Sequence, residues 1–102
     1  MSISKKFLKS KPVCKVTFKL PKEMAAEAQN VSLVGDFNAW DVKDLPMKSL
    51  KSGGFTATLN LEQGKEYQFR YLINGETWEN DEAADKYVPS PFSGADNSVV
   101  VL

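Results

Sequence analysis

The chain of 102 residues contains no histidine and only one cysteine, Cys14. Without histidine, the Ser-His-Asp and Cys-His arrangements of nucleophilic catalysis are excluded, as are zinc sites that use histidine ligands. A single cysteine excludes a disulfide within the chain and a metal site made of thiolates. Because Cys14 lies in a strand-like run, we expect it to serve as a small buried apolar side chain.

The sequence also lacks the glycine-rich motifs that cradle phosphate groups, G-x-x-x-x-G-K and G-x-G-x-x-G. Glycoside hydrolysis needs only two carboxylates at a set separation, so this type of catalysis is not excluded by the missing residues. However, acidic residues such as Asp36, Asp41 and Glu76 lie in predicted turns, where carboxylates are ordinarily solvated. We therefore predict that the chain is not an enzyme and that it binds no metal and no cofactor.

No apolar stretch is long enough to cross a membrane. The lysines near the start precede only Phe7-Leu8, which is too short for the apolar region of a signal peptide. Thirteen basic and thirteen acidic residues cancel, so no overall field attracts nucleic acid or an anionic membrane. These features predict a soluble, cytoplasmic protein with neither nucleic acid nor membrane as a partner.

The charges are unevenly spread along the chain. Residues 1–22 carry seven lysines and no acid, whereas residues 76–96 carry six acids and Lys86 alone as a base. Two interpretations stay open: a basic tail on a solvated surface, or a basic arm that contacts an acidic partner or the chain's own acidic loop. We accordingly divide the chain into a basic N-terminal arm, residues 1–12, and one domain, residues 13–102.

Alternation of apolar and polar residues dominates the domain and predicts strands. The predicted strands are Val13–Leu20, Val31–Gly35, Leu45–Lys51, Phe55–Leu61, Tyr67–Ile73, Thr77–Glu79 and Ser98–Leu102. Pro46 suggests an edge strand, and Asn74-Gly75 predicts a type I′ hairpin turn. Residues 80–97 are expected to form a long surface loop. About seven strands without convincing helices predict an all-β fold, a β-sandwich.

Two tryptophans are candidates for ligand binding. Trp40 lies in a polar turn rather than in an apolar run, and Trp78 follows the predicted hairpin turn. A tryptophan ring offers a flat apolar face and a polar N–H, which suit a sugar ring with C–H faces and a hydroxyl rim. Core packing explains Trp40 poorly, although either ring can instead pack against the sandwich. Phe37, by contrast, is expected to anchor its turn in the core.

Polar residues near Trp78 complete a candidate sugar site. Arg70 alternates with the aromatic residues of its strand, so it is expected on the outer face of the sheet, where Trp78 returns beside it. Its guanidinium offers several donors to hydroxyl oxygens, and the amide of Asn97 can both donate and accept. Taken singly, Arg70 is typical of a solvated strand residue and Asn97 of a turn.

Three sequence blocks in order resemble one known family. They are residues 31–40 (VSLVGDFNAW), residues 67–75 (YQFRYLING) followed by Trp78, and residues 96–101 (DNSVVV). The blocks are similar to the carbohydrate-binding modules of family forty-eight. That family includes the glycogen-binding domain of AMP-activated protein kinase β subunits and the N-terminal early-set domains of isoamylases and branching enzymes. The resemblance covers residues 13–102, nearly the whole chain.

The resemblance implies an immunoglobulin-like β-sandwich of early-set type. In the kinase subunit the glycogen site uses two tryptophans, a basic strand residue and an asparagine, and the matching positions here are Trp40, Trp78, Arg70 and Asn97. The kinase domain also uses a leucine from a loop, which has no clean match in this chain; Phe92 or Ser93 lies nearest to its position. Arg70 stands where the kinase domain has lysine, and Trp78 lies one residue further from the turn.

The function implied is non-catalytic binding of α-1,4-glucans such as glycogen, starch or maltooligosaccharides. The alternative is a protein-interaction module that regulates or targets a separate glycogen-metabolising enzyme.

Overall fold

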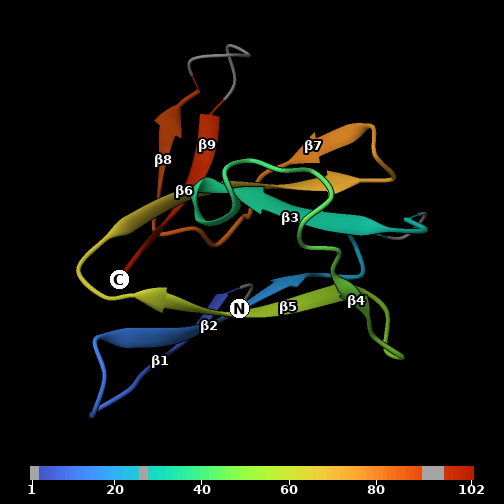
Figure 1. Cartoon of the computed structure of the whole chain (residues 1–102). Coiled ribbons are helices and arrows are strands. Elements are labelled where there is room, and N and C mark those ends of the chain that lie inside the picture. The colour runs from blue at the N-terminus through green and yellow to red at the C-terminus, as the bar shows by residue number, and fades with distance from the viewer. Residues whose placement is uncertain (1–2, 26–27, 91–95) are drawn as a thin grey trace.

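The computed structural model describes residues 3–25, 28–90 and 96–102. These residues form two antiparallel sheets that pack face to face, with nine strands in the described part (Figure 1). The strands are β1 (Ile3–Phe7), β2 (Val13–Leu20), β3 (Val31–Gly35), β4 (Lys48–Ser49), β5 (Phe55–Glu62), β6 (Glu66–Ile73), β7 (Thr77–Glu79), β8 (Lys86–Pro89) and β9 (Asp96–Val101). A 3-10 turn, η1 (Asp36–Asn38), follows β3. The all-β, immunoglobulin-like sandwich is confirmed.

The first sheet has the strand order β1-β2-β5-β4. Strand β2 alternates as its sequence predicts, with Cys14, Val16 and Phe18 buried and Lys15 and Lys19 exposed. This period of two follows from the pleat, which points successive side chains to opposite faces. The apolar half of β2 therefore builds the core, and the other half forms the outer surface.

The second sheet has the order β3-β6-β9-β8, and β7 also pairs with β6. Strand β9 pairs with the first half of β6, and β7 pairs with its second half, so both lie along the same long strand. Phe69 and Tyr71 of β6 point into the core and are buried. Their neighbours Gln68, Arg70 and Leu72 therefore belong to the outer face.

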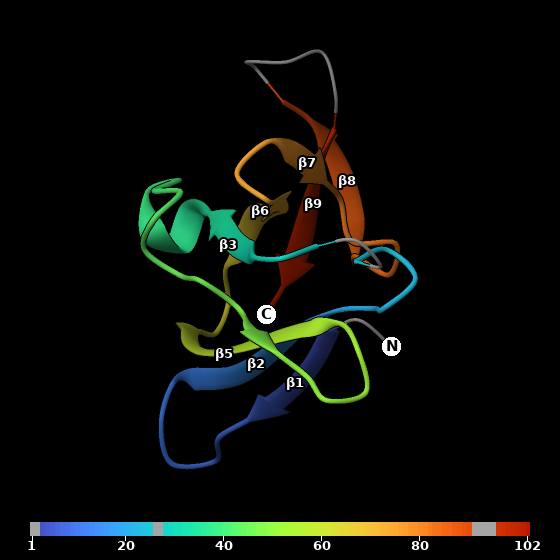
Figure 2. The ribbon, with the colours of Figure 1, turned by 90° about the vertical axis from the view of Figure 1, so that its right-hand side faces the viewer.

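Aromatic rings join the two sheets in the core. The ring of Phe18 lies 5.0 Å from that of Phe69 and 5.7 Å from that of Phe37, measured between centroids. Phe37 belongs to η1, which lies beside β3 at one end of the second sheet (Figure 2). The prediction that Phe37 anchors its turn in the core is confirmed, because it packs on Phe18, Tyr67 and Phe69.

The segment around Pro46 passes from one sheet to the other. Leu45 accepts a hydrogen bond from Leu33, and Met47 donates one to Val31, so this segment runs along β3. Lys48 and Ser49 then pair with β5 in the first sheet. The predicted edge position is confirmed, but the strand is only two residues long because the chain changes sheets within it.

Two strands were not predicted. Residues Ile3–Phe7, placed in the basic arm, form β1 and pair with β2, so this part of the arm belongs to the sandwich. Lys5 also donates to the carboxylate of Asp85 at 2.6 Å, which is a contact between the basic segment and the chain's own acidic segment. Strand β8 lies within the predicted loop 80–97 and pairs with β9. Among the described residues, no helix is long and apolar enough to span a bilayer.

Candidate functional site

The outer face of the second sheet brings Arg70 and Asn97 together. The Nε of Arg70 donates to the Oδ1 of Asn97 at 2.6 Å, and the Nδ2 of Asn97 donates to the Oε1 of Gln68 at 3.0 Å. Arg70 is only 8% exposed and Asn97 only 4%. The two residues are therefore neither a solvated strand residue nor a turn residue. They form a nearly buried polar cluster, and Asn97 lies within β9.

Gln68 is a member of this cluster that sequence reasoning did not single out. The sequence spacing already indicates its position, because Gln68 lies two residues before Arg70 and so shares its face of the strand. What the sequence does not reveal is that Asn97 lies beside this pair, since that depends on the pairing of β6 with β9. Once the pairing is known, the amide of Asn97 bridges the two β6 side chains.

Trp78 lies on the same outer face and is 42% exposed. It pairs directly with Leu72, and directly opposed residues present their side chains on one face of a sheet. Leu72 lies two residues after Arg70, so Trp78 shares the face of Arg70. Trp78 is thus both a cross-strand neighbour of Leu72 and an accessible ring.

The loop before Trp78 accommodates the one additional residue that separates Trp78 from the Asn74-Gly75 turn. Asn74 and Gly75 have φ values of 53° and 69°, and Glu76 donates its N–H to the carbonyl of Ile73 at 3.0 Å. These are features of the predicted type I′ turn. Glu76 is then an extra loop residue before Thr77 pairs with Ile73. The longer spacing therefore leaves Trp78 on the outer face.

Trp40 is held in its loop by Asp36. The Nε1–H of Trp40 donates to Asp36 Oδ1 at 2.9 Å, and Asp36 Oδ2 accepts the backbone N–H of Gln68 at 2.7 Å. Trp40 is half-buried, and its backbone adopts a φ of 60°. Because its indole N–H already has a partner, Trp40 can offer a ligand its ring rather than its donor. Asp36 is exposed, as expected of a solvated acid, and in addition it positions Trp40.

Gly35 allows this arrangement by bringing β3 close to β6. A Cβ atom at Gly35 would lie 2.4 Å from the carbonyl oxygen of Gln68 and 2.7 Å from Cβ of Phe69. Both distances are shorter than real Cβ contacts, so a side chain at this position would push the strands apart. The absence of a side chain lets Asp36, the next residue, reach the backbone of Gln68.

A buried network fixes the chain directly after β7. Asp81 accepts the hydroxyl of Tyr71 on Oδ2 at 2.6 Å, and its backbone N–H donates to Ser98 at 2.9 Å. Ser98 in turn donates to the side chain of Asn80 at 2.8 Å. Burial, together with the charge and hydrogen bond of Asp81, raises the pKa of Tyr71 well above its ordinary value. The network ties the end of β7, and hence Trp78, to β9.

The remaining predicted contacts, Phe92 and Ser93, lie outside the described residues. Of the four principal candidates, the structure joins Arg70 and Asn97 directly and places Trp78 on their face. Trp40 is linked to the same strand through Asp36 and Gln68. The roles of these residues in sugar binding stay predictions.

Residues 13–93 match the family described as Carbohydrate-binding module 48 (Isoamylase N-terminal domain). The chain belongs to this family. Membership confirms the resemblance drawn from the three sequence blocks, and it supports a carbohydrate as the ligand of the domain. The match includes Trp40, Arg70 and Trp78, whereas Asn97 lies beyond its end. A search of curated proteins gives no match.

Proposed function

We propose that the outer face of the second sheet binds α-1,4-linked glucans such as glycogen, starch or maltooligosaccharides, and that it catalyses no reaction on them. The observation that carries the proposal is the exposed ring of Trp78 on the same face as the Arg70–Asn97 cluster. A glucose unit stacked on this ring would bring its hydroxyls toward a polar floor. Apolar faces and polar edges of the sugar would then both be matched.

The two tryptophans have different roles in this proposal. Trp78 is the more exposed ring and serves as the principal stacking platform. Trp40 is fixed through Asp36 to β6 and supplies a second, preorganised surface. A ring that is already held in place loses less conformational entropy when the ligand binds.

Arg70 and Asn97 form the floor of the proposed site. Both are nearly buried, so a sugar hydroxyl meets the edge of the cluster rather than a mobile side chain. A guanidinium can donate to hydroxyl oxygens, and the bond from Nε to Asn97 fixes the position of this group in the floor. Because such a site is shallow and sugar hydroxyls must be desolvated, we expect dissociation constants of roughly micromolar to millimolar.

The test is a titration with maltoheptaose followed by tryptophan fluorescence. We expect a saturable change in the wild-type protein and binding weaker by about two- to tenfold in Trp78→Ala, since an aromatic stacking contact contributes about 0.5–1.5 kcal/mol. Phe7→Ala removes an exposed aromatic ring from the first sheet and is the matched control. Unchanged affinity in Trp78→Ala, or equal affinity for cellohexaose, would contradict the proposal.

A second candidate function is that of a protein-interaction module that targets or regulates a glycogen-metabolising enzyme. Its supporting observation is again the exposed Trp78, because tryptophan is a frequent anchor in protein interfaces. The Trp78→Ala variant distinguishes the two proposed functions. Retention of such an enzyme by Trp78→Ala, with loss of maltoheptaose binding, favours the glucan site. Loss of the enzyme from a chain that binds no sugar favours the interaction module.

A further inference from the structure

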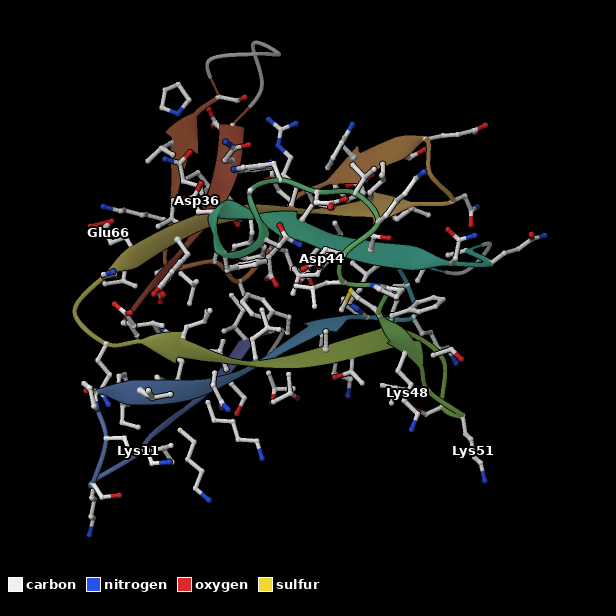
Figure 3. The ribbon with its side chains drawn as sticks, in the orientation of Figure 1. Lys11, Asp36, Asp44, Lys48, Lys51 and Glu66 are labelled. Carbon is white, nitrogen blue, oxygen red and sulfur yellow. The ribbon has the colours of Figure 1, made fainter. Side chains whose placement is uncertain are left out.

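The charges of this chain are divided between its two sheets. Nine of the thirteen basic residues but only one of the thirteen acidic residues, Glu62, lie in residues 3–22 and 48–62, which hold the first sheet. Lys11, Lys48 and Lys51 lie along this sheet, whereas Asp36, Asp44 and Glu66 lie along the second sheet (Figure 3). The net charge of zero therefore conceals one strongly basic side.

The outer surface of the first sheet, here called the lysine face, carries Lys6, Lys15, Lys19 and Lys48, with Ser4, Thr17, Thr56, Thr58 and Asn60 between them. Glu62, opposite Val13, lies at one end of this face and is ion-paired with Lys65. The strand register arranges these side chains in rows. Lys6 lies opposite Lys15, and both Lys19 and Lys48 lie opposite Thr56. Thr17 and Thr58 form a hydroxyl row between the lysine rows, with their oxygens 3.1 Å apart. All four lysines are exposed.

No acidic side chain neutralises these four lysines within the part of the chain that the structure describes. There, the ion pairs join Lys5 to Asp85, Lys65 to Glu62 and Lys86 to Glu66. The lysine face therefore presents its full positive charge to its surroundings.

Sheet stability does not explain the arrangement. Like charges directly opposite each other, as in Lys6 and Lys15, destabilise a sheet. Protection of exposed edges accounts for lysines on β1 and β4. It does not account for Lys15 and Lys19, because β2 lies inside the sheet between β1 and β5.

The composition of the lysine face also indicates which class of partner it fits. Protein interfaces centre on aromatic residues and arginine and are depleted in lysine. Single-stranded nucleic acids require aromatic platforms for stacking. Neither aromatic residues nor arginine belong to the lysine face as defined. A planar array of flexible ammonium groups and hydroxyls instead matches the phosphates and carboxylates of anionic lipid headgroups, which form an extended negative plane.

We infer that the lysine face docks on the surface of an anionic lipid bilayer. This inference replaces the prediction, drawn from the net charge of zero, that a membrane is not a partner. Each lysine near such a surface strengthens partition by about fivefold, so four lysines suffice for reversible, salt-sensitive attachment. Anionic lipids are concentrated in the cytoplasmic leaflet, which agrees with the predicted cytoplasmic location. The second sheet lies on the opposite side of the sandwich, so attachment leaves Trp78 accessible (Figure 1). The inference stands independently of glucan binding.

The test is co-sedimentation of the whole chain with phosphatidylcholine vesicles that contain about one-third phosphatidylserine. We expect binding at low salt, loss of binding at high salt, and none to pure phosphatidylcholine. Lys15→Glu with Lys19→Glu should lower partition by about 25-fold or more, which is two losses of about fivefold. Equal binding to both vesicle types would overturn the inference.

A control variant separates the lysine face from net charge. Lys43→Glu with Lys86→Glu makes the same change in charge at exposed positions outside the first sheet and should retain vesicle binding. An equal loss in both double variants would overturn the inference, as would tighter binding to duplex DNA than to anionic vesicles at the same salt. Lys15→Gln with Lys19→Gln repeats the test without charge reversal, and circular dichroism confirms that each variant is folded.

Discussion

The indole N–H of Trp40 donates to Asp36 at 2.9 Å, and the second oxygen of that carboxylate accepts the backbone N–H of Gln68 at 2.7 Å. One side chain thus fixes a loop tryptophan to the strand that carries Arg70. The loop needs such a link because Ala39 and Trp40 both adopt positive φ, which is unfavourable for residues with a Cβ. The position of Trp40 therefore depends on Asp36.

Replacement of Asp36 by alanine should weaken glucan binding more than it weakens the fold. We expect the dissociation constant for maltoheptaose to rise by about three- to tenfold, because Trp40 loses its charged acceptor. The free energy of unfolding should fall by about 1–2 kcal/mol. Calorimetric titration and urea unfolding measure the two effects. Asp44→Ala, an exposed carboxylate of the same loop, is the control, and an unchanged affinity in Asp36→Ala would contradict the assignment.

Replacement of Gly35 by alanine should destabilise the whole sandwich. The new Cβ would meet the backbone of Gln68 and the Cβ of Phe69, neither of which can move independently of β6. We expect a loss of about 2–3 kcal/mol, the usual cost of an overpacked core position. Urea unfolding monitors the change. Ser32→Ala on the same strand should stay within about 0.5 kcal/mol of wild type, and similar values for both variants would refute the close approach.

Tyr71 should make the protein less stable at alkaline pH. Its pKa is raised by burial first and then by Asp81, so the folded state keeps a proton that the unfolded state loses above about pH 10. The free energy of unfolding should then fall with rising pH by about 1.4 kcal/mol per pH unit.

Tyr71→Phe isolates this effect. At neutral pH the variant should lose about 1–3 kcal/mol, because Asp81 loses a buried donor. Above about pH 10, however, its stability should decline less steeply than that of the wild type. Tyr67→Phe, which removes a tyrosine hydroxyl that makes an exposed bond, is the matched control. Urea unfolding across this pH range gives both slopes, and identical slopes for wild type and Tyr71→Phe would exclude the proposed linkage.

The contact between Lys5 and Asp85 should contribute stability at neutral pH that disappears in acid. Burial raises the pKa of Asp85, but the Lys5 hydrogen bond, the Val101 N–H and the Lys5 charge together lower it below its ordinary value of 3.8. A lowered pKa in the folded state stabilises the protein above the unfolded pKa, and this stabilisation is lost as pH falls through the folded value.

Asp85→Asn should therefore cost about 0.5–1 kcal/mol at neutral pH, since the pair is partly exposed and screened. The difference from wild type should close as the pH falls through the lowered pKa of Asp85 in the folded state, where its carboxyl becomes protonated. Thermal unfolding at several pH values measures the difference in stability between wild type and Asp85→Asn. Glu62→Gln, in a fully exposed pair, is the matched control. A difference that persists in acid would show that Asp85 acts through packing rather than charge.

Local patterns predicted the parts of the fold that local physics determines. The alternation in β2 and β5 follows directly from which side chains must be buried. The Asn74-Gly75 turn was predictable because few residues tolerate positive φ. Phe37 was predictable as a core residue because a phenylalanine has no polar group to place in water.

The features that were missed depend on pairing between distant segments. β1 was hidden because Lys5 and Lys6 resemble a solvated tail, and only β2 gives it a partner. β8 lies among acidic residues and prolines and becomes a strand only beside β9. Asp36 and Gln68 likewise acquire their roles through the contact between β3 and β6, which no short sequence window encodes.

The most direct test of the proposed glucan site is a ¹H–¹⁵N NMR titration of the whole chain with maltoheptaose. We expect saturable shifts of the indole resonances of Trp40 and Trp78 and of the side-chain resonances of Arg70 and Asn97. The amides of the lysine face should stay unchanged. Shifts confined to the first sheet, or no shifts at millimolar sugar, would contradict a glucan site on the second sheet.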